Sequence, residues 1–210
     1  MEKSDALQEL EKEIMENKNL PLQKSNLVFG EGNINADIMF IGEAPGYYED
    51  QLKRPFVGRS GKLLDKLIAS VGWKREDVYI TNIVKRRPPE NRDPSPEEIE
   101  TYKPYLTRQI EIINPKVIAT LGRFSMNYFL PVAKITRDQG KVFRLGKRLL
   151  VPLFHPAAAL RSTETLTAFE QSFKKLPRVI QEYEKLMSVG VFTHTQEKTN
   201  EETIKQQNLL

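Results

Sequence analysis

The sequence predicts an α/β fold: a three-layer αβα sandwich around a central, mostly parallel sheet of four strands. Two observations support this prediction. Four short runs are rich in β-branched and aliphatic residues, and stretches with helical periodicity separate them. Strands that alternate with helices form a largely parallel sheet that is covered on both faces. The four strands are expected within residues 37–43, 77–84, 116–122 and the second arm of a hairpin over 141–156, which turns at Gly146-Lys147.

Helical periodicity marks the segments that cover this sheet. Apolar residues recur at helical spacing over residues 5–17, 61–72, 96–114 and 165–187. The third of these helices begins after Ser95, a typical N-cap residue that is followed by proline and two glutamates. Pro177 predicts a kink or a break in the last helix, because proline cannot donate its backbone hydrogen bond.

Length and composition limit the possible classes of protein. The 210 residues suggest one domain over residues 1–187, with an N-terminal helix within 1–19, and a polar, disordered tail over 188–210. Cysteine is absent, which excludes disulfides and thiolate-held metals. The net charge of +4 is compatible with a polyanionic partner without being diagnostic of one. We see neither a secretory signal nor an apolar run of about 20 residues, and expect a cytoplasmic protein.

The first strand ends in a turn that can approach a ligand closely. In the stretch GEAPGYYED, Gly42, Pro45 and Gly46 favour a tight turn with accessible backbone N–H groups. Glu43 and Glu49 add carboxylates. Ligands of open parallel sheets bind at the carboxyl ends of the strands, so a binding role is one interpretation. A surface turn with solvated acids is the other.

The loop after this turn carries an unexpected aromatic residue. Phe56 stands between charged residues and glycines, where stacking on a planar ligand is an alternative to a place in the core. Arg59 and Ser60 follow, between Gly58 and Gly61, at a helix start that suits a phosphate group.

The other strands end in polar residues as well. Asn82 closes a β-branched run, and its amide suits the edge of a nucleobase, although a structural amide satisfied by the backbone is equally common. A basic loop follows, and Arg123 marks another helix start. His155 ends the fourth strand. A lone histidine is usually structural, but this one falls at the same predicted sheet edge as Glu43, Phe56 and Asn82.

Four blocks together closely resemble the family-four uracil-DNA glycosylases of bacteria and archaea. They read GEAPGYYED, RPFVGRSGKLLD, TNIVKRRPPENRDPSPEE and FHPAAALR, and the resemblance extends over about residues 20–186. It implies a DNA repair enzyme that flips uracil out of DNA and hydrolyses the N-glycosidic bond, releasing uracil and leaving an abasic site.

The resemblance also implies roles for individual residues. Glu43 and His155 would be catalytic, with Glu43 orienting water and His155 donating a hydrogen bond to uracil O2. Phe56 would stack on the base, and Asn82 would read its edge. Uracil-binding residues are expected to be Gly42, Gly46, Glu49, Phe56 and Asn82, with Glu49 or a neighbouring tyrosine excluding the thymine methyl group. DNA-binding residues are expected to be Arg59, Ser60, Lys85, Arg87, Arg123, Leu160 and Arg161, the last two filling the gap in the base stack.

One departure from the family is large. Its members usually hold a four-iron, four-sulfur cluster with four cysteines, and the matching positions here are Asn17, Leu20, Arg86 and Tyr102. None of these side chains replaces a thiolate ligand, so we expect neither a cluster nor another metal. Apolar packing by Leu20 and Tyr102 would hold this region instead, with Arg86 exposed or paired.

Alternatives to uracil excision stay open at this point. One is a glycosylase for other deaminated bases such as hypoxanthine or xanthine, because a tyrosine pair stands near the base-reading turn. Another is a catalytically inactive DNA-binding homologue. In each case we expect DNA as the partner, no membrane association and a monomer; the sequence does not identify a protein partner for the tail. A related branch of the family forms a covalent link to DNA through a histidine in an inserted loop rich in Arg and His. We see no such insertion between Phe143 and Arg161, and therefore expect ordinary turnover.

Overall fold

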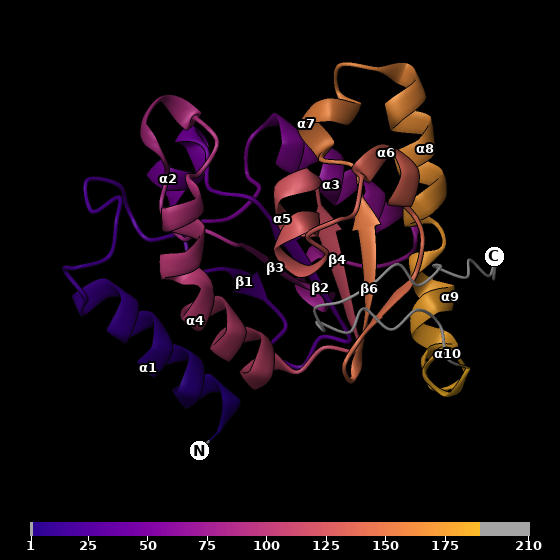
Figure 1. Cartoon of the computed structure of the whole chain (residues 1–210), viewed down its shortest axis with the longest axis horizontal. Helices are drawn as coiled ribbons and strands as arrows, with labels where there is room; N and C mark the ends of the chain where they lie inside the picture. The colour runs from indigo at the N-terminus through magenta and orange to yellow at the C-terminus, as the bar shows by residue number, and fades with distance from the viewer. Residues whose placement is uncertain (1, 190–210) are drawn as a thin grey trace.

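A mixed sheet runs through the centre of the protein (Figure 1). The computed structural model describes residues 2–189, and within them the sheet has six strands in the order β1-β3-β2-β4-β6-β5. The strands β3, β2, β4 and β6 are parallel, whereas β1 and β5 are antiparallel to their neighbours at the two edges. The strands are β1 Glu31–Gly32, β2 Ile38–Gly42, β3 Tyr79–Asn82, β4 Val117–Leu121, β5 Phe143–Leu145 and β6 Arg148–Leu153.

The predicted strand count of four is wrong, because two antiparallel strands extend the parallel centre. The four predicted strands form that centre. The predicted hairpin supplies β5 as its first arm, and Gly146 adopts a positive φ of 59° in the turn. The other edge strand, β1, has only two residues, which is too short for an alternating pattern to reveal it.

Helices cover both faces of the sheet, as predicted. Figure 1 shows α1 and α4 on one side of the sheet and the C-terminal helices α8–α10 on the other. Two short 3-10 turns, η1 and η2, span Arg75–Asp77 and Pro89–Asn91. The helices are α1 Lys3–Glu16, α2 Tyr47–Leu52, α3 Arg59–Ser70, α4 Pro96–Ile113, α5 Arg123–Phe129, α6 Ile135–Asp138, α7 Pro156–Ala159, α8 Thr163–Phe173, α9 Leu176–Gln181 and α10 Tyr183–Ser188.

Alternation along the strands divides the apolar residues between two cores. In β2, Ile38 and Phe40 belong to the core under α3 and α8–α10, while Met39 and Ile41 belong to the core under α1 and α4. The Phe40 ring stacks on Phe173 of α8 at a centroid distance of 5.3 Å. Since both cores are built on the same strands, the carboxyl ends of β2, β3, β4 and β6 are held rigidly at one edge.

Local signals set the helix boundaries. Ser95 caps α4, accepting a hydrogen bond from the backbone N–H of Glu98, and the Glu98 carboxylate accepts one in return. The predicted helix over 165–187 is divided into α8, α9 and α10, and Pro177 lies in the first turn of α9, which confirms the predicted break.

The last helix of the described residues is α10, which ends at Ser188. The sequence predicts a domain that ends at residue 187 and a tail over 188–210. The rest of the predicted tail, residues 190–210, lies outside the described residues. Within residues 2–189, none of the helices is long and apolar enough to cross a membrane.

Candidate active site

The structure brings four of the predicted site residues together at the carboxyl edge of the sheet. Gly42 ends β2 and Asn82 ends β3, and the two are register partners in neighbouring strands. The Phe56 ring lies over Gly42: a Cβ added there would lie 2.5 Å from Phe56 Cζ and 2.4 Å from Asn82 Oδ1. The His155 ring is 5.9 Å from the Phe56 ring between centroids. Only glycine at position 42 leaves room for this arrangement.

Asn82 is a buried amide whose oxygen has no partner. The residue is 2% exposed, and its Oδ1 makes no hydrogen bond to any described residue. A buried polar atom without a partner typically costs about 1–3 kcal/mol, so proteins rarely keep one without a reason. The sequence left open whether this amide is structural or binds a base. Its unpaired oxygen beside an aromatic ring favours a hydrogen-bond donor on a planar ligand.

Phe56 is held in an unusual backbone conformation. Its φ of 50° lies in the left-handed region, which non-glycine residues seldom adopt. Gly61 permits this conformation, because a Cβ at that position would lie 1.8 Å from the Phe56 carbonyl oxygen. The ring is 6% exposed. Phe56 is therefore buried and lies against Gly42 and His155 of the site.

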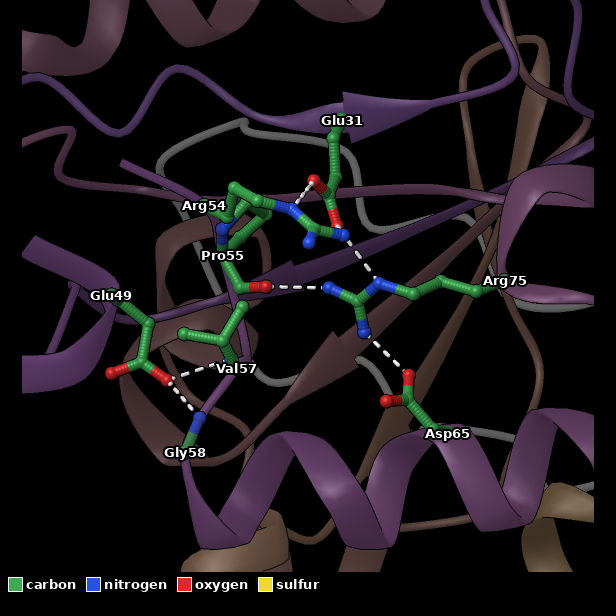
Figure 2. A network of polar contacts seen from close by, with 8 residues as sticks. All are labelled: Glu31, Glu49, Arg54, Pro55, Val57, Gly58, Asp65 and Arg75. Atoms are coloured by element: carbon green, nitrogen blue, oxygen red, sulfur yellow. Dashed lines mark hydrogen bonds and ion pairs between the residues drawn. The ribbon is translucent and has the colours of Figure 1, made fainter. Parts of the chain in front are cut away.

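Glu49 anchors the same loop from the other side. Its Oε1 accepts hydrogen bonds from the backbone N–H groups of Val57 at 2.9 Å and Gly58 at 2.8 Å (Figure 2). Its Oε2 faces Gly46, where an added Cβ would be 2.8 Å away. One carboxylate oxygen thus fixes the loop that carries Phe56, a role that the sequence did not indicate.

The geometry of His155 determines which nitrogen can donate. Its Nδ1 accepts a hydrogen bond from the backbone N–H of Ala157 at 3.1 Å, at the start of α7. Burial lowers the pKa of His155 to about 4, and the nearby Glu49 charge opposes that shift only in part. The imidazole is therefore neutral at pH 7. With Nδ1 accepting, its proton is on Nε2, which is free to donate to a ligand.

Glu43 is a half-buried carboxyl group that titrates near neutrality. Burial and, to a smaller extent, the charge of Asp93 raise the pKa of Glu43, Arg123 lowers it in part, and the resulting pKa is about 7. Arg123 Nη2 pairs with Asp93 Oδ2 at 2.9 Å. A carboxyl group with a pKa near 7 can exchange protons at physiological pH. Asp93, which contributes to this, was not among the sequence candidates.

Most of the predicted DNA-binding side chains lie on the surface near this edge. Arg59 and Ser60 begin α3, and Leu160, directly after α7, is 43% exposed. The Arg87 guanidinium lies 5.2 Å from the centroid of the Tyr47 ring. Tyr47 and Tyr48 are 51% and 61% exposed, so aromatic and basic groups adjoin on α2 and the loop after β3. The other exposed candidates are Arg123 and Arg161.

Lys85 is the exception, and its predicted contact with phosphate is wrong. The side chain is fully buried and donates to Thr81 Oγ1 and Gln109 Oε1, each at 2.6 Å. Burial lowers the pKa of Lys85 well below its ordinary value. Lys85 therefore links β3 to α4 inside the protein, although it belongs to a basic run that is typical of a surface.

The positions that match cluster ligands in the family are engaged with protein groups. Asn17 Nδ2 donates to the Tyr105 hydroxyl at 2.8 Å, and the Tyr102 hydroxyl donates to the Pro21 carbonyl at 2.9 Å. Arg86 Nη1 donates to a backbone carbonyl at 2.5 Å.

These residues do not fit an iron–sulfur cluster. The chain has no cysteine, and a cluster needs thiolate ligands. In the described part of the chain, no group of three or more His, Asp or Glu side chains is arranged to hold a metal ion. Leu20 and Tyr102 instead pack in the core under α1 and α4, and Arg86 is paired, as the sequence predicts for this region.

The fold and this edge define an α/β protein whose site suits a planar ligand with hydrogen-bonding edges. Residues 29–177 match the family model of the uracil DNA glycosylase superfamily. The chain is 45% identical over 183 residues to the type-4 uracil-DNA glycosylase of Archaeoglobus fulgidus, covering 82% of this chain and 92% of the relative. It is 48% identical over 146 residues to that of Thermotoga maritima, covering 68% and 76%. The chain belongs to the uracil-DNA glycosylase superfamily.

Proposed function

We propose that this protein is a uracil-DNA glycosylase, which excises uracil from DNA and leaves an abasic site for repair. One observation carries the proposal: the unpaired Oδ1 of buried Asn82 lies beside Phe56 and Gly42, where a flipped base would supply the missing donor. The relatives that match most of the chain carry the name type-4 uracil-DNA glycosylase, which supports the same conclusion.

Recognition follows from the chemistry of the uracil edge. A base inside a duplex is out of reach, and extruding it costs a few kcal/mol. Phe56 would stack on the flipped ring, Asn82 Oδ1 would accept from N3–H, and Asn82 Nδ2 would donate to O4. Cytosine presents an acceptor at N3 and a donor at C4, so each of these hydrogen bonds would be lost and buried groups would remain unpaired.

Cleavage separates charge along the bond from the sugar to the base. As the bond between C1′ and N1 breaks, its electron pair moves to uracil, and positive charge develops on the deoxyribose. His155 Nε2–H would donate to O2 and stabilise the uracil anion through a fixed dipole. Ionised Glu43 would orient the water that attacks C1′ and accept its proton, which the departing base can take up later.

Several groups on the same face would hold the DNA. Arg59, Ser60, Arg87 and Arg123 would contact phosphates and make binding dependent on salt. Leu160 and Arg161 follow the turn that carries His155 and would occupy the gap left in the base stack.

The proposed enzyme works without an iron–sulfur cluster or any other metal. The side chains at the matching positions, which bond to protein groups, support this part of the proposal. We further propose one domain over residues 1–187 that acts as a monomer in the cytoplasm.

The test is base release from oligonucleotides that each contain one uracil, hypoxanthine or xanthine. We expect uracil to be released and the other two bases to be released far more slowly. His155→Ala should lose most of the activity while the protein stays folded, with only a small fall in melting temperature from the lost cap of α7. Preferred release of hypoxanthine or xanthine would indicate the wider glycosylase. DNA binding without release of any base would indicate an inactive homologue and contradict the proposal.

A further inference from the structure

A second cluster of charged side chains lies beside the 54–58 loop, on the side away from Glu49 (Figure 2). Its centre is Arg75 in η1, whose guanidinium makes three directed contacts. Nε donates to Glu31 Oε1 at 2.8 Å, Nη1 to Asp65 Oδ1 at 2.5 Å, and Nη2 to the Pro55 carbonyl at 2.5 Å. Strand β1, helix α3 and the 54–58 loop that leads into α3 are thereby joined to one side chain.

The contact with Pro55 places a restraint directly before Phe56. The Glu49 carboxylate supplies the restraint directly after it, through the N–H groups of Val57 and Gly58. A residue with a positive φ, such as Phe56, persists only where its surroundings determine its conformation. Arg75 and Glu49 hold opposite sides of this strained residue.

The cluster suits arginine and no other cation. A guanidinium presents several N–H groups in a fixed plane, and here they serve two carboxylates and a carbonyl at once. Lysine offers a single ammonium group at the end of a flexible chain and would not maintain all three contacts. The Arg75 side chain is 21% exposed and Glu31 is 24% exposed, so the cluster is partly shielded from solvent. Among the described residues, neither Arg75 nor Glu31 makes a hydrogen bond or ion pair with Asn82, Glu43 or His155.

We propose that Arg75 is a positioning residue for base recognition, acting through the Pro55 carbonyl to hold the Phe56 ring where a flipped base stacks. This role rests on the proposed glycosylase function, since stacking matters only if a base enters the site. Arg75 sets the conformation of the loop and takes no part in the chemistry.

Hydrogen exchange on the full-length protein tests the holding role without any substrate. Arg75→Lys should speed exchange of the Val57 and Gly58 amides several-fold, while amides of the central strands stay unchanged. Arg54→Lys is the matched control, because Arg54 also pairs with Glu31 but makes no contact with the Pro55 carbonyl. Unchanged exchange in Arg75→Lys, or an equal effect in Arg54→Lys, would overturn the proposal.

A double-mutant cycle tests whether the effect reaches the base through Phe56. Stacking of one base on an aromatic ring is worth about 1–3 kcal/mol, so Phe56→Leu should lower kcat/KM for uracil release by about 5- to 150-fold. Arg75→Lys should lower it about fivefold in the wild-type background and less than twofold in the Phe56→Leu background. Equal losses in both backgrounds would contradict the positioning role. A wild-type protein that releases no uracil would instead refute the proposed function. Hydrogen exchange at Val57 and Gly58 would still show whether Arg75 holds the loop.

Discussion

Two regions of this molecule differ in whether their buried polar groups have hydrogen-bond partners. At the carboxyl edge of the sheet, Asn82 leaves its amide oxygen without a partner. Between β3, α1 and α4, Lys85 makes two hydrogen bonds, and Asn17 and Tyr102 are paired as well. Arg86 is intermediate, since its Nη1 is paired and its Nε is not.

The difference separates residues that serve a ligand from residues that serve the fold. An unpaired buried oxygen lowers stability unless something binds to it, so the edge is arranged for a ligand. Paired groups in the other region add stability and need no ligand. Substitutions at the edge should therefore change activity more than stability, and substitutions between β3 and α4 should do the reverse.

The largest effect is expected at Asn82. Asn82→Ala would remove both hydrogen bonds that we propose to the base, and should lower kcat/KM for uracil release by about 100-fold or more, equivalent to about 3 kcal/mol. The control is Thr120→Val in β4. Thr120 Oγ1 is also buried and unpaired, but Thr120 alternates with Ala119 and Leu121 and so faces the other core. Thr120→Val should keep activity. If Asn82→Ala lowers kcat/KM for uracil release by less than fivefold, the unpaired oxygen of Asn82 does not serve a ligand, and the contrast between the two regions is wrong.

The next effect is the pH dependence set by Glu43. Its raised pKa of about 7 means that the carboxyl is neutral below that pH and cannot accept a proton from water. If it acts as a base, kcat/KM should rise about tenfold per pH unit up to pH 7 and then level off. His155, with a pKa of about 4, should add no step between pH 5 and 8.

Glu43→Gln is the matched variant for this profile. It should lower the activity and abolish the step near pH 7, because the amide does not titrate. A wild-type profile that is flat through pH 7 would exclude the base role and leave Glu43 as an electrostatic support.

A smaller effect distinguishes Arg87 from Lys85. Loss of one phosphate contact reduces the slope of log K against log salt by about 0.9. Arg87→Ala should show this reduction in fluorescence anisotropy with a uracil-free duplex. Lys85→Met should leave the slope unchanged, because the fully buried Lys85 side chain does not reach the DNA. A reduced slope in Lys85→Met would restore the original prediction for that residue.

The smallest effect is expected at Tyr102. Tyr102→Phe removes its hydrogen bond to the Pro21 carbonyl and should lower the free energy of unfolding by about 1 kcal/mol, measured in urea. Uracil release should stay within twofold of wild type. A large loss of activity at unchanged stability would place this region in the DNA-binding surface.

The sequence predicts the centre of the fold well for a physical reason. The four parallel strands are short runs made mostly of aliphatic and β-branched residues, because both faces of the central sheet are covered and nearly all of these residues are buried. The rule that ligands bind at carboxyl ends then directs attention to Gly42, Asn82 and His155. The short strand β1 and helix α7 carry too few residues for periodicity to reveal them.

Contacts between distant segments are beyond this kind of prediction. Arg75 reaches Glu31 across 44 residues and Pro55 across 20, and no local pattern links them. The burial of Lys85 was missed because neighbouring arginines make the run resemble a solvated surface. The influence of Asp93 on Glu43 likewise arises from the folded arrangement alone.

Uracil release and iron content measured on the same preparation of full-length protein test the central claim most directly. The substrate is an oligonucleotide with a single uracil, incubated with a chelator present throughout. The account predicts repeated turnover with iron far below one atom per chain. Activity that disappears with the chelator and returns with iron would contradict the claim that this glycosylase works without a cluster. No release of uracil at all would contradict the proposed glycosylase activity.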